Sequence, residues 1–257
     1  MPDAIRGGKP AKQLQLADII VLSFLFFADY IMSSIQFYFS NVVADTKTEM
    51  PAEMPVNFSI QDNYNIIIME LGSLVIIFVY LYLRRFDYSN LTISFDKKVI
   101  LQALLLIGLA GITADIIIYV GYMLASPPME TVTAVANNIN QLSVEQAEAK
   151  QLNHGSFQFT FSLLLVSLLN GFYEEVFFLG LLCTVSQKLL PASIIIGLII
   201  RFLLHIYQGI FSALIILAMG IIFLVCRKYI KNLVPFFLAH AFFDFYGLIL
   251  FWHLVYI

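Results

Sequence analysis

Long apolar runs separated by short polar segments occupy the chain from residue 16 to residue 256. A helix needs about 20 apolar residues to cross a bilayer, and the runs predict seven such spans, at residues 16–40, 63–83, 99–125, 157–187, 191–207, 210–226 and 233–256. The fourth run is longer than one crossing needs. We expect it to bend at Asn170-Gly171, because glycine weakens a helix locally. The fifth and sixth runs turn tightly at Gln208-Gly209, and a count of eight spans is the alternative.

Composition gives the same class of protein. Apolar residues make up 60% of the 257 residues and charged residues 12%, against roughly 45–50% and 25% in soluble domains. The 14 Lys and Arg residues do not exceed the 17 Asp and Glu residues, so the basic excess of a nucleic-acid-binding protein is missing. The sequence therefore predicts an all-α fold, a polytopic membrane helical bundle of about seven transmembrane helices.

Basic residues divide unequally between the two sets of loops. Eleven of the 14 lie in one set, Lys47 and Lys150 lie in the opposite set, and Arg201 lies inside a span. The eleven are Arg6, Lys9, Lys12, Arg84, Arg85, Lys97, Lys98, Lys188, Arg227, Lys228 and Lys231. The positive-inside rule places this set, and the N-terminus with it, in the cytoplasm.

Ionisable residues recur deep inside three of the predicted spans. The patterns are Glu174-Glu175, Arg201-x-x-x-His205 and His240-x-x-x-Asp244. A spacing of four places both members of a pair on one helix face. With the helical rise of 1.5 Å per residue, these residues lie about 14–21 Å from the nearest basic loop, near the middle of a core about 30 Å thick. Glu70 has a similar depth, and it could line the same cavity or pair with Arg201.

A charged side chain near the bilayer centre costs a few kcal/mol and needs a structural or functional reason. Three helices that bring carboxylates and imidazoles to one depth are expected to form a single site. Glutamate can take a proton from water, one histidine can orient that water and protonate a leaving amine, and a second can stabilise an oxyanion. The combination suits hydrolysis of an amide in the membrane plane.

A metal ion is the alternative way to activate water with the same residues. Glu174, His205 and His240 could bind zinc and leave a position open for water. The sequence does not separate metal-activated from glutamate-activated water.

The three patterns resemble the motifs of the CPBP family, which contains CAAX-processing endopeptidases and bacteriocin-processing or immunity proteins and is also called the Abi family. Glu174-Glu175 begins a segment similar to the family's Glu-Glu-x-x-x-Arg motif. His205 and His240-x-x-x-Asp244 resemble the second and third motifs, in the right order over residues 157–250. The resemblance implies an intramembrane protease in which Glu174 and His205 activate water, and His240 and Asp244 lie at the oxyanion.

Two positions depart from the family's motifs. Leu179 stands where the first motif has arginine, and Arg201 stands where the second motif has phenylalanine. The motif arginine would lie four residues after Glu175, within reach of it along one helix. We expect Arg201, on the next helix, to replace this arginine as the counter-ion of Glu175.

The prediction is an intramembrane endopeptidase that cuts a membrane-associated peptide or protein, with the lipid bilayer as its surroundings and the site at Glu174, Glu175, His205, His240 and Asp244. Alternatives are a non-proteolytic scaffold or bacteriocin-immunity protein that keeps this fold, and an ion-coupled carrier. The expected division is a cytoplasmic segment at 1–15, transmembrane helices and loops at 16–156 and the catalytic core at 157–257. A multi-pass protein of the bacterial plasma membrane is expected, and the oligomeric state is not predicted.

Overall fold

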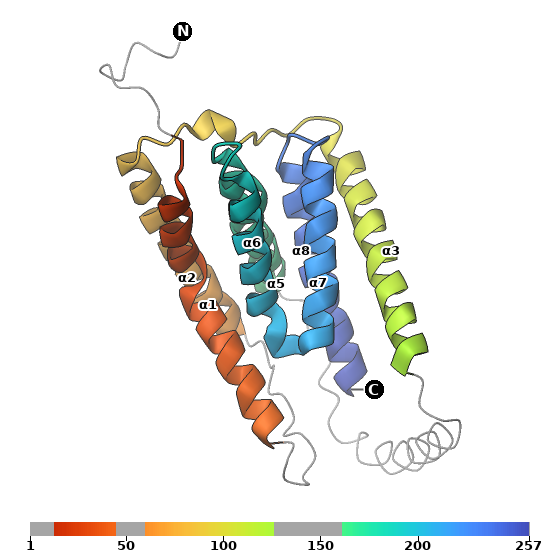
Figure 1. Ribbon diagram of the computed structural model, residues 1–257. Coiled ribbons are helices and arrows are strands. Elements are labelled where there is room, and N and C mark those ends of the chain that lie inside the picture. Colours follow the sequence, from red (N-terminus) through yellow and green to blue (C-terminus); the bar gives the residue numbers. More distant parts are fainter. Residues whose placement is uncertain (1–12, 45–59, 126–160, 257) are drawn as a thin grey trace, which may run out of the picture.

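The computed structural model describes residues 13–44, 60–125 and 161–256, with side chains except at 41–44, 122, 125 and 248–256. Seven long helices occupy these described ranges (Figure 1): α1 Leu16–Ala44, α2 Ile60–Leu83, α3 Val99–Ala125, α5 Phe161–Glu175, α6 Leu190–His205, α7 Ile210–Arg227 and α8 Val234–Tyr256. Shorter helical segments are η1 Tyr88–Asn90, η2 Val176–Gly180, η3 Leu181–Thr184 and η4 Ile206–Gln208. The all-α fold predicted from the sequence is confirmed.

The helices run side by side as a bundle (Figure 1), as expected for a multi-pass membrane protein. Within the described residues, six helical segments are long and apolar enough to cross a membrane, and they belong to α1, α2, α3, α5 with η2 and η3, α6 with η4, and α7. Helix α8 adds 23 residues, about 35 Å at 1.5 Å per residue. Leu83, Leu101 and Leu124, which face outward, are exposed by 71–84%, as expected for side chains in contact with lipid.

The bundle is closed by neighbouring pairs of helices. Helix α1 packs against α2 and α6, α2 packs against α5, and α5 packs against α8. Helix α3 packs against both α7 and α8, and α7 completes the circuit by packing against α6. The fully buried segment η2 follows α5, so the C-terminal end of α5 lies inside this circuit.

One end of the bundle carries the basic residues and is here named the basic end. It contains Arg84 after α2, Lys97 and Lys98 before α3, Lys188 before α6, and Arg227 at the end of α7. Arg84 Nε lies 2.6 Å from Asp18 Oδ1 on α1, and the Tyr80 hydroxyl donates to the same oxygen at 2.7 Å. These contacts join α1 to α2.

The opposite end, here named the far end, contains the turn between α6 and α7. This turn ends at Gly209, whose φ of 93° lies in a region that other residues rarely adopt. In Figure 1 the turn stops short of the far ends of α1 and α8. The tight turn predicted at Gln208-Gly209 is therefore present.

The core between α1 and the C-terminal half of α5 is aromatic. Phe27 stacks on Phe178 with ring centroids 5.3 Å apart, and it meets the Phe177 ring edge-on at 5.0 Å. The Tyr173 hydroxyl donates to the Phe26 carbonyl oxygen at 2.6 Å. Aromatic pairs add about 0.5–1.5 kcal/mol each beyond the area they bury, so this cluster fixes the rotation of α5 about its axis.

The bend expected at Asn170-Gly171 is not present, and this expectation was wrong. Helix α5 continues through both residues to Glu175, and the regular α-helical pattern changes at the π-helical segment η2 and the 3₁₀ segment η3. Gly171 has a different role: a Cβ at this position would lie 2.6 Å from the Phe237 carbonyl oxygen of α8. The glycine permits close packing of α5 on α8.

Candidate active site

Glu175 lies at the centre of the polar residues inside the bundle and has no exposed surface. Its Oε1 accepts a hydrogen bond from Arg201 Nη2 of α6 at 2.7 Å. His240 Nδ1 of α8 lies 2.7 Å from the same oxygen. One carboxylate oxygen therefore joins the three helices that carry the three sequence motifs.

The packing around Arg201 holds its guanidinium in place. The guanidinium carbon lies 4.2 Å from the centroid of the Phe178 ring, an arrangement that favours a cation. On the other side is Gly220 of α7, where a Cβ would lie 2.7 Å from Arg201 Cδ. A buried ion pair needs both partners, because removal of one leaves an uncompensated charge that costs about 3–5 kcal/mol.

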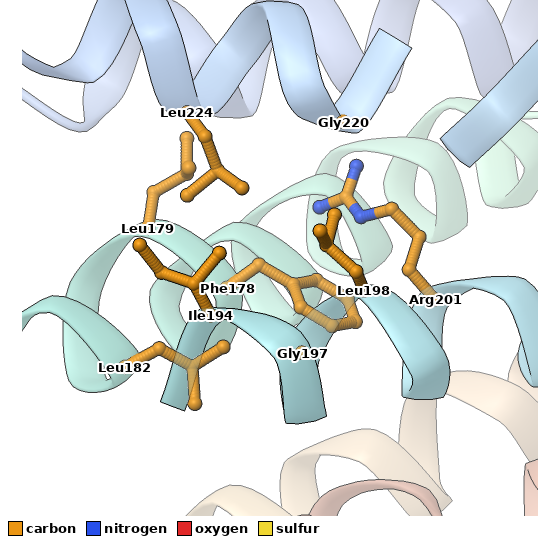
Figure 2. A pocket seen from close by; sticks show the side chains of 9 residues that line it. All are labelled: Phe178, Leu179, Leu182, Ile194, Gly197, Leu198, Arg201, Gly220 and Leu224. Carbon is orange, nitrogen blue, oxygen red and sulfur yellow. The ribbon is translucent and has the colours of Figure 1, made fainter. Parts of the chain in front are cut away.

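Leu179 and Arg201 line the same small cavity. Figure 2 shows their side chains on opposite sides of it, with Phe178 between them and Gly220 beside the guanidinium. The cavity measures about 10 Å³, close to the smallest space that holds one water molecule. Leu179 is fully buried, so the position that carries arginine in the family motif contributes an apolar side chain.

His240 lies between two further carboxyl groups. Its Nε2 is 3.4 Å from Asp244 Oδ1 and 3.8 Å from Glu174 Oε2. Asn170 Nδ2 donates to Asp244 Oδ2 at 2.7 Å. The two ring nitrogens therefore face different partners, Nδ1 toward Glu175 and Nε2 toward the space between Glu174 and Asp244.

Glu174 retains an oxygen that can act on a small molecule. Its Oε2 is buried and accepts no hydrogen bond from the described residues, and the residue is 6% exposed. A buried polar atom normally has a partner. Water or a substrate group is the partner that this oxygen can take.

His205 lies at the C-terminal end of α6, closer to the far end than Arg201. Its Nδ1 is 2.8 Å from the Arg201 carbonyl oxygen, which leaves Nε2 free of that contact. In the described structure His205 borders the site, whereas Glu174, Glu175, His240, Asp244 and Arg201 are in direct contact or within 4 Å of a partner.

Asn170 joins the site without having been predicted in it, whereas Glu70 was expected either to line the cavity or to pair with Arg201. Asn170 precedes Glu174 by four residues and so shares its helix face, a signal that the sequence contained. Glu70 of α2 is 1% exposed, its Oε2 has no partner among the described residues, and it interacts electrostatically with Glu174. Its predicted alternative, a pair with Arg201, is not formed, since Arg201 pairs with Glu175.

The described residues do not fit a metal ion in the arrangement expected for zinc. Across residues 13–44, 60–125 and 161–256, no group of three or more His, Cys, Asp or Glu side chains is placed to hold one. Glu174 and His240 are adjacent, but the Nδ1 of the third expected ligand, His205, faces the backbone of its own helix.

Comparison with known families gives one match. Residues 156–246 match the family described as Type II CAAX prenyl endopeptidase Rce1-like. The match includes all three motifs and confirms the resemblance to the CPBP proteins. Searches of curated proteins and of solved structures gave no significant match.

Proposed function

We propose that this membrane protein is a peptidase that hydrolyses a peptide bond within the bilayer, because residues 156–246 match the family described as Type II CAAX prenyl endopeptidase Rce1-like. The substrate is a membrane-associated peptide or protein. The observation that carries the proposal is the position of the His240 ring, whose Nδ1 lies 2.7 Å from Glu175 Oε1 and whose Nε2 lies 3.8 Å from Glu174 Oε2, an oxygen that accepts no hydrogen bond from the described residues.

Glu174 is the general base in this proposal. Its Oε2 takes a proton from a water molecule, and the water oxygen forms a bond to the carbonyl carbon of the substrate. General bases placed in this way contribute roughly 10²–10⁴-fold to a rate. His205, whose Nε2 is free of the contact to the backbone, assists in orienting the water and supplies a proton to the leaving nitrogen as the C–N bond breaks.

His240 is placed where negative charge develops, with Asp244 beside its Nε2. When the His240 ring carries both protons, Nδ1 donates to Glu175 and Nε2 donates into the space beside Glu174 and Asp244. A donor fixed in advance at an oxyanion stabilises the tetrahedral intermediate, and loss of one such donor costs about 10²–10³ in kcat. Glu175 is a positioning residue, because it fixes the ring without facing the reacting atoms.

Arg201 gives Glu175 the cation that the motif arginine would supply. This contact bears on the second candidate function, a scaffold or immunity protein without peptidase activity, because Leu179 was its only support in the sequence. With Glu175 already paired to Arg201 at 2.7 Å, the peptidase is the better-supported function. We further propose that the N-terminus is cytoplasmic and that the host membrane is a bacterial plasma membrane.

Glu174→Gln tests the general base. It removes a proton acceptor and keeps nearly the same shape, so we expect membrane insertion at the wild-type level and loss of peptide processing by at least about 10²-fold. The measurement compares, by mass spectrometry, the membrane peptides of cells that express each variant. Asp29→Asn is the matched control, because Asp29 is an exposed carboxylate of α1 outside the site.

The proposal requires that some peptides accumulate with Glu174→Gln, that their fragments disappear, and that Asp29→Asn matches the wild type. Identical peptides with wild type and Glu174→Gln would instead support the scaffold.

A further inference from the structure

Exposure of the site residues changes in one direction along three separate helices. On α5, Glu175 is 0% exposed and Glu174, one residue nearer the far end, is 6% exposed. On α8, the His240 side chain is 9% exposed and that of Asp244 is 26% exposed. On α6, Arg201 is buried and His205 is half-buried. In each pair the residue nearer the far end is the more accessible one.

Toward the basic end the site is covered by apolar side chains. Segments η2 and η3 follow Glu175 directly, and their residues from Val176 to Leu182 are all buried. Phe236 and Phe237 of α8 precede His240 and are buried as well. The described residues on this side therefore leave no open route to Glu175.

Toward the far end the hairpin of α6 and α7 is short. Helix α6 and η4 together span the 19 residues Leu190–Gln208, about 28 Å at 1.5 Å per residue, and the turn at their end stops short of the far ends of α1 and α8 (Figure 1). This turn carries Tyr207, which is 38% exposed, and Gln208, which is also exposed. The turn directly follows His205, the last residue of α6, so it borders the accessible side of the site.

The turn is fixed in this position by contacts with α1. The Tyr207 backbone N–H donates to Ser34 Oγ at 3.2 Å, and the Tyr207 ring meets Phe37 edge-on with centroids 6.3 Å apart. Because the hairpin ends early and is held there, the edge of the site at His205 and Asp244 is not covered by longer stretches of α6 and α7.

We propose that substrate and water reach Glu174 from the far end of the bundle. The basic loops place the far end on the extracytoplasmic side, so the substrate class is a peptide segment presented in the extracytoplasmic half of the membrane. A translocated peptide and the outer end of a membrane-spanning segment both present a peptide bond in this half of the membrane. A lipidated C-terminus in the cytoplasm lies on the opposite side. This inference rests on the proposed peptidase function for its substrate, but the direction of access can be measured without activity.

Cysteine labelling tests the direction of access. Cys183→Ser and Cys226→Ser first remove both native thiols, and Gln208→Cys then places one thiol at the turn. The probe is a membrane-impermeant maleimide carrying a polyethylene glycol, applied to intact cells and to permeabilised cells. Lys97→Cys marks the basic end, and Ile199→Cys, exposed on the same helix α6, marks a side chain in contact with lipid.

We expect Gln208→Cys to be labelled in intact cells to the same extent as after permeabilisation. Lys97→Cys should react only after permeabilisation, and Ile199→Cys should not react in either case. Labelling of Gln208→Cys only after permeabilisation would overturn the direction of access, and no labelling under either condition would overturn the aqueous route itself.

The same labelling is repeated with Glu174→Gln added. An unchanged pattern in this inactive variant shows that the direction of access does not depend on turnover. If peptide processing proves absent in the wild type while Gln208→Cys reacts from outside, the peptidase proposal fails and the direction of access stands.

Discussion

At the scale of single residues, the cation beside Glu175 comes from a different helix than in the family motif. Arg201 and Leu179 line one cavity of about 10 Å³, and only one of them is charged. The effect of a substitution at either residue on stability and on cleavage therefore depends on which side chain is present at the other, as is usual for side chains that share a cavity.

This dependence predicts the outcome of a double-mutant cycle. Arg201→Leu leaves Glu175 buried without its cation, and we expect a loss of about 3–5 kcal/mol in the free energy of unfolding together with loss of cleavage. Leu179→Arg alone places a second cation in the small cavity and should also reduce the free energy of unfolding and the rate of cleavage. The two changes together should recover part of both, because one arginine again faces Glu175.

The measurement is thermal unfolding of the purified variants in detergent, together with cleavage of the peptides that accumulate with Glu174→Gln. Leu198→Ala, at a residue that lines the same cavity without a charge, is the control for packing. Additive losses in the double variant, or wild-type cleavage by Arg201→Leu alone, would show that Arg201 is not the counter-ion.

The sequence predicted that four of the acidic and histidine side chains lie together, but not which atoms meet. Spacing and depth brought Glu174, Glu175, His240 and Asp244 to one level, and the missing motif arginine indicated Arg201. The choice of Glu175 rather than Glu174 as the partner of His240 Nδ1 depends on how α5 and α8 are rotated about their axes. That rotation is set by long-range packing, such as the Tyr173 hydrogen bond to Phe26, which helical periodicity does not encode.

At the scale of the elements, the contact between α5 and α8 sets the distance from the glutamates to His240. The closest approach is at Gly171, where a Cβ would meet two backbone atoms of α8, the Phe237 carbonyl oxygen at 2.6 Å and the Ala241 nitrogen at 3.0 Å. Backbone atoms of a packed helix have little freedom to move, so the glycine keeps the helices together.

Gly171→Ala should therefore separate the two helices and move His240 away from Glu175. We expect a loss of about 1–3 kcal/mol from overpacking and a larger fall in kcat than in stability-matched variants. Gly108→Ala is the control, because a Cβ on Gly108 of α3 meets no atom within 4 Å. Equal cleavage by both alanine variants would show that this close contact does not position the site.

The sequence predicted the bounds of the helices but not the position of the irregular segment in the helix that contains this glycine. Apolar runs gave the helices to within a few residues, since the length of a crossing is set by the bilayer. The irregular stretch was expected at Asn170-Gly171 but lies at Val176–Gly180. None of these five residues is unusual in a helix except Gly180, so no local signal marks the start of the π-helical segment.

At the scale of the whole molecule, the bundle supplies a site whose described side chains do not converge on a metal ion. We expect cleavage to persist after the purified protein is dialysed against a strong chelator, and zinc to be present in less than a stoichiometric amount by elemental analysis. Stoichiometric zinc, together with cleavage lost on chelation and restored by zinc, would show that Glu174, His205 and His240 rearrange into a metal site.

The proposed peptidase depends above all on Glu174 as the residue that activates water for hydrolysis inside this bundle. The most direct measurement is cleavage by the purified, membrane-reconstituted protein in water enriched in the heavy oxygen isotope, with the products analysed by mass spectrometry. We expect fragments whose new C-terminal carboxylate carries a heavy oxygen atom from the wild type and from Asp29→Asn, and none from Glu174→Gln. Fragments from Glu174→Gln at the wild-type rate, or no labelled fragments from the wild type, would contradict this role of Glu174.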